Sequence, residues 1–209
     1  MSLRTIIAEA QQILSRDDVS DDQMQIFVQQ GIARIQRECR LPSMERSVII
    51  TPAEAMQFMP VPRDLIQIID VIATDPTGTY SYPLEHVAYR SLVRELSAAN
   101  SPAMAVRYAR QQAQLWFAGP APPGVPLTLL YFGNFSPFAG LDGENELSAS
   151  TPDLAVYAAL RYAGDSVEHP STDRWEATYR DIRETVKQMA ADLENEGGIN
   201  FVRPLYLED

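Results

Sequence analysis

The spacing of apolar residues changes near residue 47 and again near residue 151, and this switch constrains the fold more than any other feature. Before residue 41, apolar residues recur every three or four positions, as in amphipathic helices. Between residues 47 and 132 the apolar segments are short, rich in β-branched and aromatic residues, and bounded by Pro and Gly, which indicates strands. Helical spacing then returns. We therefore predict an α+β fold whose N- and C-terminal helices pack as a bundle, with a small central antiparallel β-sheet or barrel module.

This order of segments predicts four regions along the chain. They are residues 1–46, the N-terminal helices of the bundle; 47–133, the β module with one short helix; 134–196, the C-terminal helices of the bundle; and 197–209, an extended C-terminal tail. An acidic stretch at residues 17–22 separates the two N-terminal helices. Negative charge at a helix N-terminus explains this stretch better than a cation site does.

The C-terminal helices have the clearest local signals. Pro152 stands at the expected first helical position, with Ser150 or Thr151 as the N-cap and Asp153 in the first turn. The final helix is expected to open at Trp175, which should be a main core anchor. Its apolar residues recur at spacings of four and three and form a heptad seam: Trp175, Tyr179, Ile182, Val186, Met189 and Leu193. The seam packs either on the same chain or on another subunit.

Charge and composition exclude several classes of protein. The 209-residue chain has a net charge of −11, and the residues from Asp142 onward hold 15 acidic against 6 basic side chains, so −9 of that charge lies there. Such an excess repels a phosphate backbone. The sequence contains no apolar run of the roughly 20 residues that span a bilayer and no continuous apolar segment of a signal peptide near its start. With Cys39 as the single cysteine, an internal disulfide is impossible, and we expect a cytoplasmic protein when it is made.

The motifs predict no catalytic, cofactor-binding or metal-binding residues, and we expect no enzyme activity. Neither His86 nor His169 has a Cys or carboxylate at a ligand spacing, and the common metal, nucleotide and nucleophile motifs are absent from the sequence. Carboxylates alternate at residues 142–146 like the first ligands of a calcium loop. The sixth position, however, is Leu147 where such a loop needs glycine, and a solvated loop is the better interpretation.

The last segment has the composition of a partner-binding strand. Gly197 and Gly198 end the final helix, and Pro204 prevents its continuation. An extended apolar segment after a hinge is suited to adding to a sheet edge or lying in a neighbour's groove, whereas folding back on its own chain is the alternative. The residues predicted to bind a partner are Ile199, Phe201, Val202, Leu205, Tyr206 and Leu207.

Three stretches carry a family resemblance: Leu129-Leu130-Tyr131-Phe132, then Pro152-Asp153-Leu154 with Tyr157-Ala158-Ala159-Leu160, then Trp175-Glu176-Ala177-Thr178-Tyr179. They are similar to the head-to-tail adaptor proteins of tailed bacteriophages, which form the ring between the portal and the tail. The resemblance implies a structural virion protein that binds the portal protein, tail proteins and further copies of itself, commonly in a ring of twelve, with DNA only as cargo in the lumen.

The same resemblance implies a protein that is in the host cytoplasm during assembly and then in the virion neck. The family has no catalytic residues to transfer to this sequence. Two other functions remain open: a virion-associated cell-wall hydrolase, and a small cytoplasmic interaction or regulatory protein.

Overall fold

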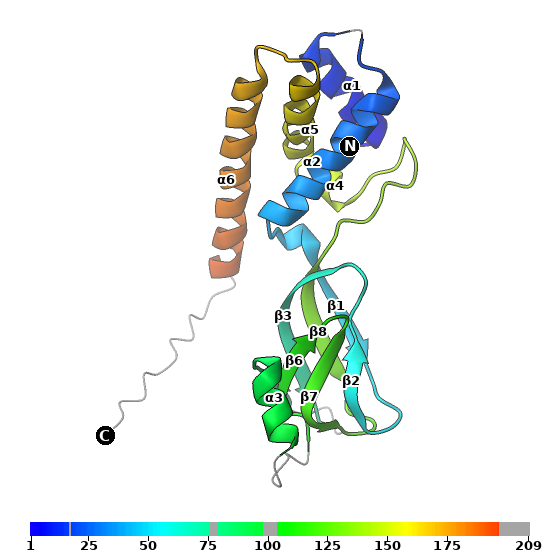
Figure 1. Cartoon of the computed structure of the whole chain (residues 1–209), viewed down its shortest axis with the longest axis vertical. Coiled ribbons are helices and arrows are strands. Elements are labelled where there is room, and N and C mark those ends of the chain that lie inside the picture. The colour runs from blue at the N-terminus through cyan, green and yellow to red at the C-terminus, as the bar shows by residue number, and fades with distance from the viewer. Residues whose placement is uncertain (17, 76–78, 98–103, 197–209) are drawn as a thin grey trace, which may run out of the picture. The chain divides into compact units, whose positions relative to one another are not determined.

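The computed structural model describes residues 1–16, 18–75, 79–97 and 104–196, with side chains through residue 192. Of the described residues 45% are in helices and 25% in strands, which confirms the predicted mixture of helix and sheet; the predicted packing of the terminal helices as a bundle stays a prediction. The chain divides into two compact units (Figure 1). The helical unit consists of Met1–Ser43 and the described residues from Phe135 onward, and the β unit consists of Met44–Asn134.

The helical unit is organised around one central helix. Its helices are α1 (Leu3–Leu14), α2 (Asp21–Glu38), α4 (Glu146–Ser150), α5 (Pro152–Ser166) and α6 (Thr172–Glu196). α5 contacts all four of the others, and its small and aliphatic residues are buried on most of its circumference. Ser20 begins α2 through a capping box with Gln23, whose side chain accepts from the Ser20 N–H at 2.9 Å. None of the described helices is long and apolar enough to cross a membrane.

Close packing of α2 on α5 depends on small residues. A Cβ atom at Gly31 of α2 would lie 2.9 Å from the Ala159 nitrogen and 3.0 Å from the Ala158 Cβ atom. Both distances are too short for ordinary van der Waals contact, so glycine is required for the observed approach of the two backbones. The two alanines contribute in the same way from the α5 side.

The observed start of the C-terminal helices matches the start predicted from the sequence in part. Pro152 is the first residue of α5, as predicted. Thr151 precedes it, but its side chain makes no capping hydrogen bond. A short helix that the sequence did not predict, α4, comes immediately before, and it is capped by Asn145, whose Oδ1 accepts from the Ser148 N–H at 2.9 Å. The chain therefore enters α5 directly from another helix.

α6 begins at Thr172, three residues before its predicted start at Trp175. Trp175 is 5% exposed and Tyr179 is completely buried, which confirms the predicted anchor. The predicted seam continues through Ile182 and Val186, which are half-buried, but Met189 is 60% exposed. The described side chains of α6 thus pack on their own chain over the first part of the seam only.

The β unit contains two four-stranded sheets. Its elements are β1 (Glu45–Ile50), β2 (Met56–Pro60), β3 (Leu65–Thr74), β4 (Ser81–Pro83), β5 (Glu85–His86), α3 (Tyr89–Leu96), β6 (Arg107–Gln111), β7 (Gln114–Ala121) and β8 (Leu127–Gly133). The strand orders are β1-β8-β3-β4 and β2-β7-β6-β5. The described pairs are antiparallel except β5 with β6, which are joined by a connection containing α3, and such a crossover returns the chain in the same direction.

One apolar core serves both sheets of the β unit. Val71, Leu127 and Leu129 enter it from the first sheet. Leu115 and Phe117 enter it from the second, and all five side chains are at most 1% exposed. The alternation along β8, in which every second residue is buried, is the pattern expected of a strand with one face on a core. The β unit is therefore a small sandwich with its own interior.

Candidate partner-binding site

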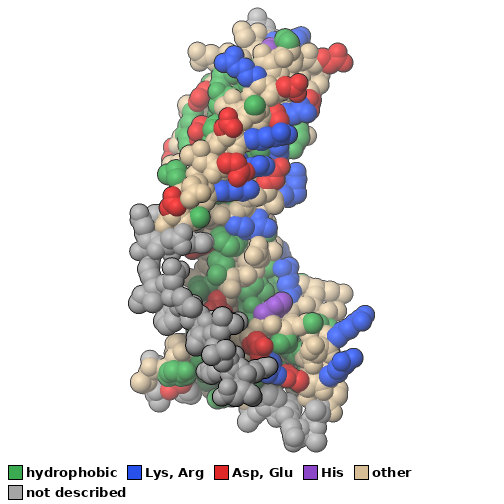
Figure 2. Space-filling model, turned by 90° about the vertical axis from the view of Figure 1, so that its left-hand side faces the viewer, with side chains coloured by type: hydrophobic (Ala, Val, Ile, Leu, Met, Phe, Trp, Pro, Cys, Tyr) green, Lys and Arg blue, Asp and Glu red, His purple; other side chains and the backbone are tan. Residues whose placement is uncertain are grey.

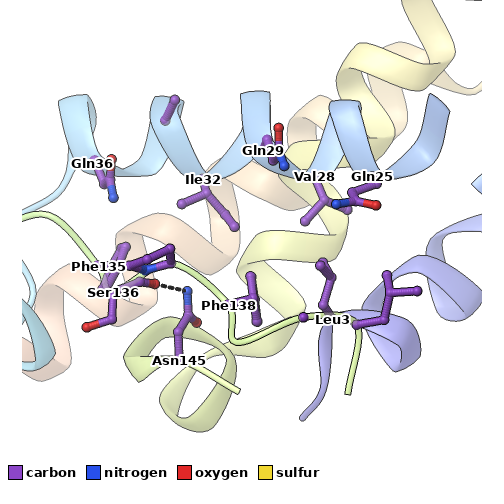
Figure 3. Close-up of a pocket in the computed structure, with 14 residues that line it drawn as sticks. Leu3, Gln25, Val28, Gln29, Ile32, Gln36, Phe135, Ser136, Phe138 and Asn145 are labelled. Carbon is purple, nitrogen blue, oxygen red and sulfur yellow. Dashed lines mark hydrogen bonds between the residues drawn. The ribbon is translucent and has the colours of Figure 1, made fainter. Parts of the chain in front are cut away.

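The predicted partner-binding residues, Ile199, Phe201, Val202, Leu205, Tyr206 and Leu207, lie outside the described residues. Within the described chain, no cluster of three or more His, Cys, Asp or Glu side chains is arranged to hold a metal ion. The histidines have aromatic neighbours: the His86 ring lies 5.2 Å from Tyr108, and the His169 ring stacks on Trp175 at 4.6 Å. The helical unit does have a groove, which runs along α2 (Figure 3).

One wall of this groove is a face of α2. Val28, Ile32 and Ala33 supply its apolar part, and the side-chain amides of Gln25, Gln29 and Gln36 stand along it (Figure 3). These positions are separated by three, four or seven residues, the spacing of one helical face. None of the three glutamine side chains hydrogen-bonds to a residue that the structure describes. The wall therefore combines an apolar surface with amide groups that are available to a partner.

The opposite wall is the loop of residues 135–145, which precedes α4. Its apolar side chains facing the groove are Phe135, Pro137, Phe138 and Leu141, and Leu3 of α1 closes one end. Phe135 is 6% exposed and fixes the beginning of the loop in the core of the unit. The groove between the two walls has a volume of about 430 Å³, within the usual range for a binding pocket.

Hydrogen bonds within the helical unit hold this loop in place. The Ser136 N–H and Oγ donate to the two carboxylate oxygens of Glu146, at 2.9 and 2.7 Å. The Asn145 Nδ2 donates to the Ser136 carbonyl at 3.1 Å (Figure 3). Asn145 is 8% exposed and also caps α4, so the loop is tied to the start of that helix. These contacts fix the loop wall of the groove.

The carboxylates at residues 142–146, considered above as calcium-loop ligands, are occupied in other ways. Asp142 accepts from Arg4 at 2.7 Å, and this exposed ion pair lowers the pKa of Asp142 through the hydrogen bond and the charge of Arg4. Glu146 is bound to Ser136, as described above. In the structure these side chains therefore stabilise the loop, each with a different partner.

The opposite flank of α2 is charged and faces α6. Arg34 forms a bidentate ion pair with Glu176, at 2.7 and 2.9 Å, and also donates to Glu38 at 2.8 Å. Its guanidinium lies 4.2 Å from the centre of the Tyr179 ring. Arg183 donates to Glu38 at 2.9 Å. Acidic and basic side chains are interspersed along this side of the molecule (Figure 2), and the network fixes α6 against α2.

Glu38 is the group whose ionisation this network controls most strongly. Burial alone would raise the pKa of its carboxyl, but donation by Arg34, Arg183 and the Tyr179 hydroxyl outweighs burial and lowers the pKa to about 2. Burial of Tyr179, together with its hydrogen bond to Glu38, raises the pKa of the Tyr179 phenol. The ion pairs between α2 and α6 therefore favour the charged form of Glu38.

The two flanks of α2 thus have opposite chemistry. Ile32 and Arg34 are separated by two residues, roughly 200° around the helix axis. On one flank, the charged side chain of Arg34 is paired with Glu176 of the same chain. On the other flank, none of the described residues that line the groove carries a charge. An uncharged groove with unpaired amides along its rim is suited to an apolar polypeptide segment, whose backbone the amides can both donate to and accept from.

The comparisons with known proteins identify a family. The family model described as SU10 adaptor protein matches residues 1–200 of the chain. The match extends over both the helical unit and the β unit, and so over the groove and its two walls. No curated protein matches the chain.

Proposed function

The chain belongs to the SU10 adaptor protein family, a family of bacteriophage head-to-tail adaptors, and we propose that it forms a ring of identical subunits that joins the portal to the tail. The observation that supports this proposal is the family match over residues 1–200, nearly the whole chain. The proposed partners are the portal protein, tail proteins and further copies of the chain, commonly twelve in such rings. The proposed location is the host cytoplasm during assembly and the virion neck afterwards.

DNA enters this proposal only as cargo in the lumen. The residues from Asp142 onward carry 15 acidic and 6 basic side chains. A channel wall with this charge repels phosphates and lets a duplex slide without binding to it. The charge pattern therefore supports passage of DNA, and it does not require a sequence-specific contact.

The six apolar residues of the tail are proposed as contacts with neighbouring proteins: Ile199, Phe201, Val202, Leu205, Tyr206 and Leu207. The adaptor family is structural and is not an enzyme family, which argues against a cell-wall hydrolase. Membership in a phage family likewise argues against a cellular regulatory protein.

Coexpression with the portal protein of the same phage tests the proposal. Purified complexes are sized by native mass spectrometry, and we expect a ring of adaptor copies bound to one portal ring. A chain that stays monomeric beside assembled portal would contradict the proposal. A turbidity assay on peptidoglycan is the companion measurement, because hydrolysis would identify the protein as the enzyme instead.

A further inference from the structure

Asp142 and Gly143, in the loop before α4, form a chemically labile pair. They are the single Asp-Gly pair of the sequence, which contains no Asn-Gly pair. Glycine lacks a Cβ atom, so its backbone nitrogen can approach the preceding aspartate side chain with little steric hindrance. We propose that Asp142–Gly143 is a site of spontaneous isoaspartate formation, and that contacts with the first turn of α1 restrain this reaction in the folded chain. The proposal is independent of the proposed ring.

The reaction has two steps and needs no reagent other than water. In the first step the Gly143 nitrogen bonds to the Cγ atom of Asp142 and loses its proton, while the C–OH bond of the neutral side-chain carboxyl breaks and water leaves. The product is a five-membered cyclic imide. In the second step water adds to one of the two imide carbonyls. Opening at the main-chain carbonyl yields isoaspartate, in which the side chain has become part of the backbone and lengthens it by one methylene group.

The packing of the loop requires the glycine that makes this reaction easy. A Cβ atom at position 143 would lie 2.7 Å from the Ala139 nitrogen and 2.9 Å from both the carbonyl carbon and the carbonyl oxygen of Ala139. These are backbone atoms, so no side-chain rotation relieves the clash. A bulkier residue that would slow the attack therefore does not fit here, and protection of the pair has to come from other contacts.

Arg4 of α1 holds the Asp142 carboxylate. Its Nε donates to Oδ1 at 2.7 Å, and its Nη2 donates to Oδ2 at 3.3 Å, so both oxygens are engaged. The hydrogen bond and the charge of Arg4 lower the pKa of Asp142. An ionised carboxylate is a poor electrophile, whereas the neutral acid reacts. The ion pair thus reduces the reactive form, although the Asp142 side chain is 79% exposed and the effect of such a pair is modest.

Backbone hydrogen bonds hold the chain on both sides of the labile pair. The Arg4 N–H donates to the Leu141 carbonyl at 2.8 Å, and the Leu3 N–H donates to the Gly143 carbonyl at 3.1 Å. The Gly143 N–H, whose nitrogen is the nucleophile of the first step, donates to the Gly140 carbonyl at 3.3 Å. Ring closure needs a rotation of the aspartate backbone that brings this nitrogen to the side chain. The three bonds oppose that rotation.

Isoaspartate at position 142 would alter the groove along α2, because Leu3 and Leu141 both line it. The carbonyls of Leu141 and Gly143 accept from consecutive N–H groups at the start of α1. An extra methylene group between these carbonyls changes their spacing, so both bonds cannot persist in their present geometry. The reaction therefore loosens the contact between the loop and α1 at this part of the groove.

Peptide mapping of the full-length protein tests the proposal. The protein is incubated at near-neutral pH, either folded or unfolded in urea, and isoaspartate at position 142 is identified by electron-transfer fragmentation. We expect isoaspartate to form about tenfold more slowly in the folded chain, because the reaction then requires a local opening of the loop. Equal rates in the two samples would overturn the restraint. An unfolded chain without isoaspartate at position 142 would overturn the site itself.

Substitution of Arg4 measures the contribution of the ion pair. We expect Arg4→Met to speed isoaspartate formation in the folded chain about threefold, which lies within the range of an exposed ion pair. Arg174→Met is the matched control, because Arg174 is also an exposed arginine but lies on α6, outside this loop. It should leave the rate unchanged. An Arg4→Met variant that reacts at the parent rate, or equal acceleration by both substitutions, would refute the role of Arg4.

Hydrogen exchange measures the structural consequence. The isomerised protein is separated from the parent by chromatography, and both are compared by mass spectrometry. We expect the amides of Leu3 and Arg4 to exchange about tenfold faster in the isomerised protein, since their acceptors lie on either side of the altered backbone. Exchange in the β unit should stay the same and serves as the internal control. Unchanged exchange at Leu3 and Arg4 would show that these bonds do not restrain the pair.

Discussion

In the helical unit, charged and aromatic side chains join α2 to α6, whereas the two sheets of the β unit pack on a shared core of mainly apolar side chains. Arg34, Glu38 and Glu176 are only partly buried, with side chains 12–30% exposed. The interior of the sandwich holds side chains such as Phe117 and Leu129 that are fully buried. A helix has a narrow apolar stripe and charged flanks, whereas a sheet can bury an entire face, so each unit uses the interaction that its elements offer.

The largest expected effects come from the two cores. Trp175→Ala in the helical unit and Phe117→Ala in the β unit should each lower the free energy of unfolding by about 3–5 kcal/mol, because each leaves a cavity. Hydrogen exchange measured by mass spectrometry should show faster exchange in α5 and α6 for the first variant and in β7 and β8 for the second. If each variant speeds hydrogen exchange equally in both units, the two units unfold together and do not have separate cores.

The ion-pair network should give the next largest effect. Arg34→Met leaves the carboxylates of Glu38 and Glu176 without their main donor, and we expect a loss of about 2–3 kcal/mol in urea unfolding, since hydrogen bonds to charged groups are the stronger kind. Arg174→Met, at an exposed position of α6, is the control and should stay within about 0.5 kcal/mol of the parent. Similar losses in both variants would mean that the network does not hold α2 on α6.

Acid should weaken the helical unit through Glu38. Its pKa is about 2 in the folded chain and about 4.5 in the unfolded chain, so its stabilising contribution is complete above about pH 4.5 and is lost as the pH falls toward 2. The loss should approach about 2 kcal/mol, given the partial exposure of the group. Each unit contains one of the two tryptophans, and a Trp116→Phe variant lets Trp175 fluorescence report on the helical unit. The same acid transition in a Glu38→Gln variant would refute this assignment.

The smallest effect on stability is expected from the tail. Deleting residues 198–209 should change the thermal stability of the monomer by no more than about 1 kcal/mol, the range of surface changes without core contacts. Incorporation into portal complexes, measured by size, should nevertheless be lost. A truncated chain that assembles normally, or a monomer that unfolds without its tail, would show that the segment only packs on its own chain.

Local sequence patterns predicted the helices and strands well, because periodicity reports directly which face of an element is buried. The apolar spacing placed α1 and α2, and Pro152 placed the start of α5. α4 was missed because its five residues are too few to show a period, although Asn145 and Ser148 are a recognisable cap. The pairing of β2 with β7 and of β1 with β8 joins segments far apart in the chain, and no local signal encodes it.

The groove could not be predicted from α2 alone. Val28 and Ile32 belong to one apolar stripe in the sequence, but only Val28 is buried, and Ile32 faces the groove. Which apolar residues remain accessible depends on the loop of residues 135–145, whose position is set by contacts of Ser136, Asn145 and Glu146. In the sequence, the recurrence of glutamine at positions 25, 29 and 36 was the pattern that could have indicated this groove.

The helical unit is discontinuous in the chain, and this has a consequence for its biosynthesis. The β unit is a continuous stretch, so it can fold on the ribosome while the remainder of the chain is still being made. α1 and α2 must wait for α5, and until then the side chains of Ile6 and Met24 have no core to enter. A chain that terminates early keeps these apolar faces in solvent, where chaperones and proteases recognise them. The helical unit can therefore form only after α5 has been synthesised.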